Sequence, residues 1–335
     1  MAPMRLDIRY ATRFRYDSPV RESHNELRAC PVDDSCQRVL DFRLRVDPAT
    51  PVQSFRDYWG TRVEAFGVIP RHDRLDVVAE ISVETHLSAE EPPAPTPIAD
   101  LAAHEPFHEY TVPSRLAAGG DGITELARSV MNGAGTAEEA GRTIADWVGR
   151  SVAYSPGSTT VETTVEEVMD RRVGVCQDFA HLTVALSRAV GLPARYVSGY
   201  LFARRDDAGS GANADGSHEP KTDEADAVRV QTHAWVEIAV APGRWLPLDP
   251  TNGRDVGERH VKIGHGRDYF DVTPFHGSFS GSADPTLVSS VEIRRRSGDD
   301  DRPTILSAAD RGLLRKPVAQ TPQRLLAQQQ EQQQQ

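Results

Sequence analysis

The sequence predicts an antiparallel β-sandwich followed by a region in which helices and strands mix. One observation is the alternation of apolar and polar residues at residues 5–16, 40–46 and 75–83, the pattern of half-buried strands. A second is the helical spacing of apolar residues that begins directly after Cys176. A third is a long alternating strand over residues 228–240, far along the chain from the first group.

The predicted sandwich covers residues 1–88. In its first strand, apolar residues share one face and charged residues occupy the other. The apolar face consists of Leu6, Ile8, Tyr10, Phe14 and Tyr16. A shorter stretch at residues 63–69 shows a similar pattern. Turn clusters such as Asp17-Ser18-Pro19 and Asp47-Pro48-Ala49 separate the strands, which favours antiparallel connections.

A linker is predicted over residues 89–106, because this stretch is rich in Pro, Ala and Glu and lacks periodicity. Beyond it, apolar spacing predicts helices at residues 123–131 and 136–148. The second helix opens with Thr136 and Glu139, the pattern of a capping box. A short helix at residues 165–169 leads to the loop before Cys176.

Cys176 stands at the first turn of the next predicted helix. The apolar stripe of that helix is Phe179, Leu182, Leu186, Ala189 and Val190, and Gly191 with Pro193 supplies the stop signal. Free backbone N–H groups and the helix dipole at a first turn favour a thiolate, which is the nucleophilic form of cysteine. A lone cysteine at a helix start is more often a packed residue, so its partners decide the interpretation.

Two such partners follow in the chain. After a strand at residues 195–202 and a polar insertion at residues 203–226, the strand over residues 228–240 carries His233 on its polar face. Asp249 ends the next strand. Cysteine, histidine and aspartate in this order are the components of a Cys-His-Asp acyl-transfer site.

The register of the hairpin decides whether His233 and Asp249 can meet. A plain two-residue loop at Pro242-Gly243 sets Asp249 opposite Val236, on the wrong face. A three-residue loop, or an equivalent bulge, sets it opposite Trp235 and diagonal to His233. We predict the second arrangement.

The rest of the chain is less patterned. Residues 254–281 are expected to be irregular, and a last strand near residues 287–294 to close a second domain that spans residues 107–296. Residues 297–335 are charged and then glutamine-rich, which predicts a disordered tail.

Composition excludes several classes of protein. The net charge of −11 argues against nonspecific nucleic-acid binding. No apolar run reaches the length of a membrane span, and the N-terminus lacks an apolar signal region, so we expect a cytoplasmic protein without membrane contact. The remaining cysteines, Cys30 and Cys36, are expected to be reduced. The absence of HExxH or CxxC spacing makes a metal site a poor fit.

Several blocks resemble the bacterial transglutaminase-like superfamily. They are Gly174-Val175-Cys176-Gln177-Asp178-Phe179-Ala180-His181-Leu182, Pro193-Ala194-Arg195-Tyr196-Val197-Ser198-Gly199-Tyr200, Thr232-His233-Ala234-Trp235-Val236-Glu237 and Asp249-Pro250-Thr251-Asn252. The front end is similar to the β domain of that group in Ser23-His24-Asn25-Glu26-Leu27-Arg28 and Arg56-Asp57-Tyr58-Trp59-Gly60. The blocks occur in order from about residue 5 to about residue 290.

The resemblance implies a papain-like α+β catalytic domain without a cofactor. It implies Cys176 as nucleophile, His233 as general base and Asp249 as the orienting carboxylate. The family includes peptidases and amidases besides transglutaminases, so the resemblance leaves the reaction open. We expect hydrolysis of an amide in a protein or peptide, rather than crosslinking, because water needs no amine-binding site. The alternative is a non-catalytic scaffold for protein–protein interaction.

For residues near these three, the sequence supports weaker predictions of their roles. Gln177, Trp235 and Tyr269 are candidates for lining a substrate cleft, although an aromatic residue in a strand is more often core. Asp178 is expected to cap the cysteine helix, and His181 to be packed and hydrogen-bonded.

Overall fold

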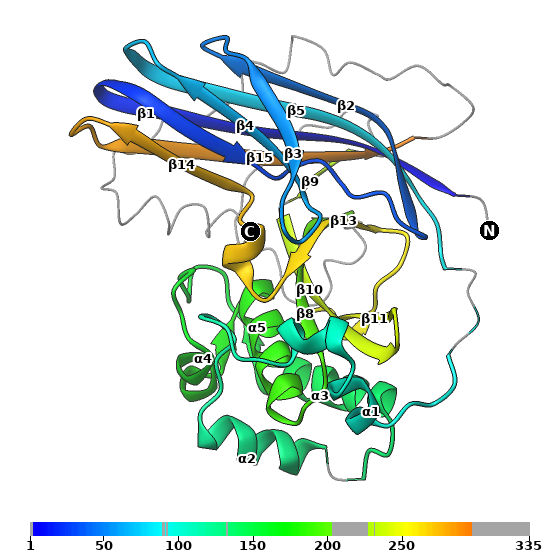
Figure 1. The fold of residues 1–335 in the computed structure, drawn as a ribbon. Helices are drawn as coiled ribbons and strands as arrows, with labels where there is room; N and C mark the ends of the chain where they lie inside the picture. The colour runs from blue at the N-terminus through cyan, green and yellow to red at the C-terminus, as the bar shows by residue number, and fades with distance from the viewer. Residues whose placement is uncertain are drawn as a thin grey trace.

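The computed structural model describes residues 3–88, 91, 93–131, 133–202, 227–230 and 232–296, with the backbone alone for 227–230. The insertion predicted over 203–226 and the tail predicted over 297–335 lie outside the described residues. Figure 1 shows three layers: a large curled sheet, a smaller sheet beneath it, and helices on the far face of the smaller sheet. No helix in the described part of the chain is long and apolar enough to cross a bilayer.

The large sheet is antiparallel and contains eight strands. They are β1 (Met4–Leu27), β2 (Gln37–Asp47), β3 (Val52–Arg56), β4 (Arg62–Val68), β5 (His72–Thr85), β9 (Ala227–Val230), β14 (Phe275–Ser280) and β15 (Pro285–Arg295). The first half of β1 lies between β5 and β15, and its second half between β4 and β14. The β1–β5 register shifts between Arg15 and Val20, and Glu22 has a φ of +48°. Irregularities of this kind bend a strand, which lets one sheet curl.

The antiparallel N-terminal region is therefore confirmed, but two features differ from expectation. The strands form one continuous sheet rather than two stacked sheets. In addition, β14 and β15 pair with β1, although we expected these residues to close the catalytic domain. The physical reason is burial: Leu287, Val291 and Ile293 of β15 extend the apolar face that begins on β1.

All the helices except a short one at residues 269–272 lie within residues 98–189 of the described chain. They are α1 (Ile98–Ala102), η1 (Glu105–Tyr110), α2 (Asp121–Val130), α3 (Ala137–Ser151), α4 (Val165–Arg171) and α5 (Cys176–Ala189). The Thr136–Glu139 capping box is confirmed, since Glu139 N–H donates to Thr136 Oγ1 and Thr136 N–H donates to Glu139 Oε2. The predicted linker is partly structured, because α1 lies inside it and buries Leu101 completely.

The smaller sheet has the order β12-β11-β10-β8-β13. Its strands are β8 (Ala194–Leu201), β10 (Thr232–Ala241), β11 (Arg244–Asp249), β12 (Arg254–Asp255) and β13 (His260–Gly266), and a parallel pair, β6 (Ala153–Tyr154) and β7 (Val173–Gly174), lies before α5. Residues 260–266 and 275–280 were expected to be irregular and are strands instead. Their pairing partners, β8 and β1, lie far away in the sequence, so the local pattern did not reveal them.

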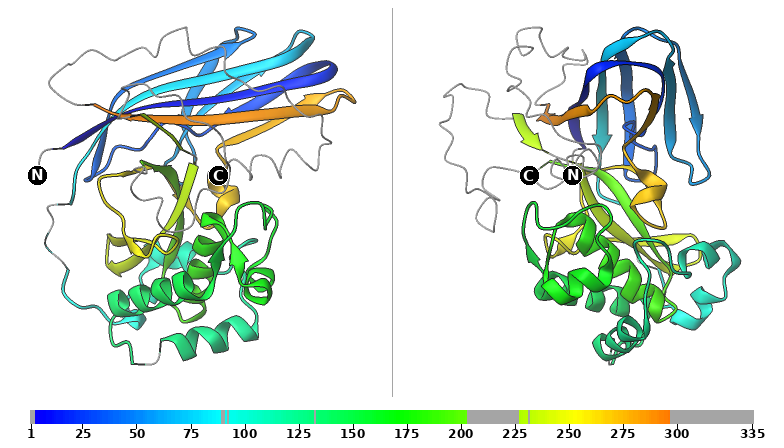
Figure 2. Two further views of the ribbon diagram at one scale, coloured as in Figure 1. Left: turned by 180° about the vertical axis from the view of Figure 1, so that it is seen from behind. Right: turned by 90° about the vertical axis from the view of Figure 1, so that its left-hand side faces the viewer.

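Both faces of the smaller sheet are buried, which fixes the position of the site. Ala234, Val236 and Ile238 of β10 pack with the helices in one core. On the other side, Tyr200 and Val261 pack into the core of the large sheet, and Figure 2 shows the small sheet between the two other layers. Gln37 joins the layers, since its side-chain amide accepts from Lys262 N–H at 2.8 Å and donates to Lys262 O at 2.7 Å.

Candidate active site

Cys176 is the first residue of α5, as predicted, and only 3% of it is exposed. The turn before it is tight, because a Cβ atom on Gly174 would lie 2.8 Å from the Asp178 Cβ. Asp178 caps the helix: its Oδ2 accepts from Val175 N–H at 2.8 Å and from Thr159 Oγ1 at 2.6 Å. Burial raises the pKa of Asp178 to about 6, although these two hydrogen bonds oppose the shift. The thiol thus lies at a helix N-terminus, where backbone N–H groups favour negative charge.

His181 lies one turn further along α5 and is a packed residue, as expected. Its ring stacks on Tyr196 with 4.8 Å between centroids, and its Nε2 accepts from Tyr269 N–H at 3.2 Å. Burial lowers the pKa of His181 to about 4, so the ring is neutral near pH 7.

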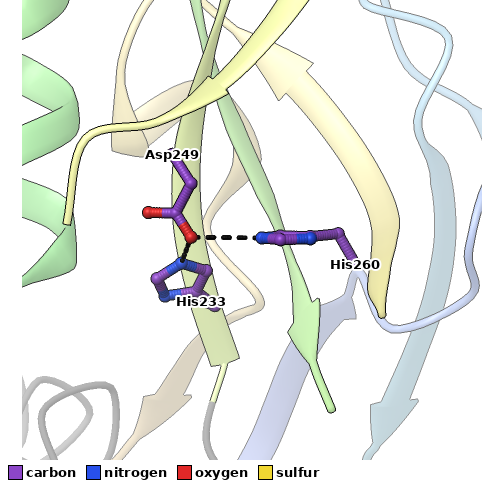
Figure 3. Close-up of side chains that lie close together, drawn as sticks. All are labelled: His233, Asp249 and His260. Atoms are coloured by element: carbon purple, nitrogen blue, oxygen red, sulfur yellow. Dashed lines mark hydrogen bonds and ion pairs between the residues drawn. The ribbon is translucent and has the colours of Figure 1, made fainter. Parts of the chain in front are cut away.

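The β10–β11 hairpin brings His233 and Asp249 together. The turn residues are Pro242 and Gly243, the latter at a φ of +71°, and the register shifts by one residue at Val240. Because of this bulge, Leu248 pairs with Val236, which sets Asp249 opposite Trp235 and diagonal to His233. The predicted register is confirmed, with the bulge in place of a three-residue loop. His233 Nε2 lies 2.8 Å from Asp249 Oδ2 (Figure 3).

His233 also lies within hydrogen-bonding reach of Cys176. Since Nε2 faces Asp249, the interaction with the thiol falls to Nδ1. Burial alone would lower the pKa of His233, but the charge of Asp249 and the hydrogen bonds to Asp249 and Cys176 raise it to about 10. This raised pKa makes His233 a strong acceptor for the thiol proton, and Asp249 stabilises the imidazolium that forms when the proton is transferred.

Asp249 is completely surrounded by donors. Its Oδ2 accepts from His233 Nε2, from His260 Nε2 at 3.1 Å and from Asn252 Nδ2 at 2.7 Å. Its Oδ1 accepts from the backbone N–H groups of Thr251 and Asn252 at 3.1 and 3.2 Å. Burial opposes the charge, yet the interactions with His233 and His260 hold the pKa of Asp249 well below its usual range.

The three candidates for lining a cleft are all buried. Gln177 follows Cys176 on α5, and Tyr269 begins the short helix η3 (Tyr269–Val272). The Trp235 indole lies across Gly199, where a Cβ would collide with it, and meets the His260 ring edge-on at 5.3 Å. Their role in substrate binding stays a prediction.

Two residues of this cluster were not singled out from the sequence. Asn252 lies in the Asp-Pro-Thr-Asn block, and its spacing of three residues from Asp249 is that of a local side-chain contact. His260 lies at the start of β13. The alternation of Val261 and Ile263 was the available signal for that strand, but the glycines around it weaken the pattern.

A metal ion is the alternative interpretation of these residues. One ligand atom from each of His233, Asp249 and His260 lies within 4.8 Å of the others, and two imidazoles with a carboxylate suit zinc. However, both imidazoles donate to the same oxygen of Asp249. A hydrogen-bond network therefore accounts for all three side chains.

Comparisons with known proteins identify the family of this chain. Residues 124–250 match the transglutaminase-like superfamily, and residues 6–84 match the bacterial transglutaminase-like N-terminal region. An uncharacterized protein of Mycobacterium leprae is 32% identical over 295 residues, which cover 87% of this chain and 99% of that protein. The chain belongs to the transglutaminase-like superfamily.

Two further proteins are similar to this chain over most of its length. An uncharacterized protein of Mycobacterium tuberculosis is 31% identical over 314 residues, which cover 88% of this chain and 94% of that protein. A solved structure from Cytophaga hutchinsonii, provisionally described as a cysteine protease, is 24% identical with a TM-score of 0.68. It covers 89% of this chain and 93% of that chain, so the two chains share their fold over most of their length.

Proposed function

We propose that this transglutaminase-like protein is an enzyme that transfers the acyl group of an amide through Cys176, His233 and Asp249. The observation that carries the proposal is the position of His233, which contacts the thiol on one side and Asp249 at 2.8 Å on the other. Nucleophile, base and orienting group within mutual reach are the signature of nucleophilic acyl transfer. The substrate is a protein or peptide.

The reaction follows from the chemistry of these groups. His233 takes the proton of Cys176, and the thiolate attacks the amide carbonyl. The backbone N–H of Cys176 and one further donor stabilise the oxyanion, each contributing about 3–4 kcal/mol. His233 then protonates the departing amine, which leaves a thioester on Cys176. Asp249 keeps the imidazole in the required tautomer throughout.

The thioester is resolved by water or by a second amine. We favour water, which makes the enzyme a cysteine peptidase or amidase rather than a crosslinking enzyme, because water needs no dedicated binding site. The proposed reaction needs no cofactor, because water accepts the acyl group when the thioester is resolved. A cytoplasmic location is part of this proposal.

The test is intact mass spectrometry after incubation with a pool of glutamine-containing proteins and peptides and a labelled primary amine. Cleavage or deamidation that requires Cys176 supports hydrolysis, and amine incorporation that requires Cys176 supports transamidation. Cys176→Ala is the inactive variant, and Cys36→Ala is the matched control with an unchanged result. If the wild type does neither and Cys176 also resists iodoacetamide near pH 6, the scaffold alternative replaces the enzyme.

A further inference from the structure

His260 is the residue of the site that the reaction above does not use. It comes from β13, whereas His233 and Asp249 come from β10 and β11, so three separate strands converge on one carboxylate oxygen. His260 is 7% exposed, and the edge of its ring packs against the Trp235 indole. A buried imidazole held from two sides has a fixed position.

The hydrogen bonds of His260 define its protonation. Gly257 N–H donates to His260 Nδ1 at 3.2 Å, so Nδ1 is the acceptor and carries no proton. The proton of the neutral ring therefore lies on Nε2, which donates to Asp249 Oδ2 at 3.1 Å. Burial lowers the pKa of His260 although Asp249 opposes the shift, in agreement with a neutral ring.

The hydrogen bond from His260 Nε2 affects the orientation of the Asp249 carboxylate. Asp249 Oδ1 is occupied by two backbone N–H groups, and Oδ2 has to point at His233 Nε2. The carboxylate can rotate about its χ2 bond, and that rotation is broad for aspartate. His260 and Asn252 donate to Oδ2 from other directions, which restricts the rotation.

We propose that His260 is a positioning residue, which keeps Asp249 Oδ2 aligned with His233 by donating a hydrogen bond from Nε2. The inference rests on the proposed acyl-transfer function. His260 contacts neither the thiol nor the substrate in this scheme. Its contribution passes through Asp249 to the imidazolium, and from there to the thiolate.

The test measures the rate of Cys176 alkylation by iodoacetamide between pH 5 and 9, which needs no substrate. The charged or titratable groups that face His260 are Asp249 of β11, His233 of β10 and Arg254 of β12. We expect His260→Leu to lower the rate at pH 6 at least about tenfold, the usual size for a partner that orients another residue, and to move the inflection towards pH 8.5. His260→Gln, whose amide can donate from a similar position, restores most of the rate.

His72→Leu is the matched control. His72 is a buried imidazole of the large sheet with hydrogen bonds to Ser23 Oγ and Pro70 O, so its loss affects stability but not the alkylation profile. A His260→Leu profile equal to wild type, or a His260→Gln profile equal to His260→Leu, overturns the proposal. A wild-type inflection near 8.5 overturns the proposed function itself.

A second measurement avoids variants that do not fold. In ¹⁵N-histidine NMR of the wild-type protein at pH 7, we expect the His260 ring to carry its proton on Nε2 alone. A ring protonated on Nδ1, or on both nitrogens, contradicts the proposal.

Discussion

Two buried carboxylates on the small sheet have partners of opposite kinds. Asp249 is surrounded by two imidazoles, one amide and two backbone N–H groups. Glu237, on β10, forms ion pairs with Arg195 Nε at 2.5 Å and Lys262 Nζ at 2.7 Å. The charges of Arg195 and Lys262 overcome burial and hold the pKa of Glu237 well below its usual range.

This difference distinguishes Glu237, a carboxylate that stabilises the fold, from Asp249, a carboxylate of the candidate active site. The partners of Glu237 are an arginine and a lysine rather than imidazoles; burial lowers the pKa of Lys262, and the charge of Glu237 opposes that shift. His265, beside Arg195, has no proton to exchange near neutral pH, because burial and the charges of Arg195 and Lys262 lower its pKa to about 3. Asp249 instead faces His233, a ring that gains and loses a proton, next to a thiol. Two buried carboxylates on the adjacent strands β10 and β11 thus serve stability and reactivity, respectively.

The largest expected effect is a loss of catalytic turnover when Asp249 is changed. Asp249→Asn keeps the shape of the side chain but removes the charge and the acceptor that fix the His233 tautomer. We expect the Cys176-dependent turnover to fall by about 10⁴-fold, as in an equivalent change of a Ser-His-Asp site. A reduction below tenfold in a folded variant would show that Asp249 is not the orienting group.

The next effect is on stability. Glu237→Leu leaves Arg195 and Lys262 buried without a counter-charge, which costs about 3–5 kcal/mol of unfolding free energy. Urea unfolding monitored by tryptophan fluorescence measures this change. The folded fraction should alkylate at Cys176 at the wild-type rate, and a loss of reactivity without a loss of stability would contradict the distinction between the two clusters.

Between pH 6.5 and pH 10, we expect the Asp249 cluster to make stability depend on pH through His233. The pKa of His233 is raised to about 10 in the folded protein, against about 6.5 for an ordinary histidine. The stability that this charge provides is complete below pH 6.5 and is lost as the pH rises towards 10. In the Cys176→Ala background the hydrogen bond and charge of Cys176 no longer add to this shift, but those of Asp249 remain, so unfolding free energy should still decline above pH 6.5, over a narrower window. Adding His233→Gln should remove that decline, and an unchanged decline would refute the assignment.

The smallest effect is predicted for His265→Phe. This neutral ring accepts one hydrogen bond from Arg195 Nη1 at 3.2 Å, so its loss costs about 1 kcal/mol. Because its pKa of about 3 keeps it neutral from pH 5 to pH 9, the alkylation profile of Cys176 should not change. A shifted profile would mean that the Glu237 cluster takes part in the chemistry.

The sequence predicted the elements of the site better than their surroundings. Helical spacing located Cys176 at the start of α5, and the alternation of β10 gave the face of His233. The bulge at Val240 was anticipated as one of two ways to align Asp249, because only an odd shift gives the required face. The triad candidates could be selected because each lies in a locally patterned element.

The features that could not be predicted from the sequence depend on pairing between strands that lie far apart in the chain. His260 enters the site because β13 pairs with β8, and β15 completes the large sheet because it pairs with β1 from the opposite end of the described chain. Neither pairing leaves a local trace in composition or spacing. The single curled sheet in the predicted sandwich region has the same origin, since the long β1 strand pairs in both halves of the sheet.

The most direct test of the central claim is the alkylation rate of Cys176 by iodoacetamide at pH 6, in the wild type and in His233→Gln. An ordinary thiol with a pKa near 8.5 is less than about 1% thiolate at this pH, whereas a thiolate paired with an imidazolium is largely ionised. We therefore predict that wild-type Cys176 reacts roughly a hundredfold faster than an ordinary thiol, and that His233→Gln loses this advantage. Equal, slow rates in both proteins would contradict the claim that His233 and Asp249 activate Cys176.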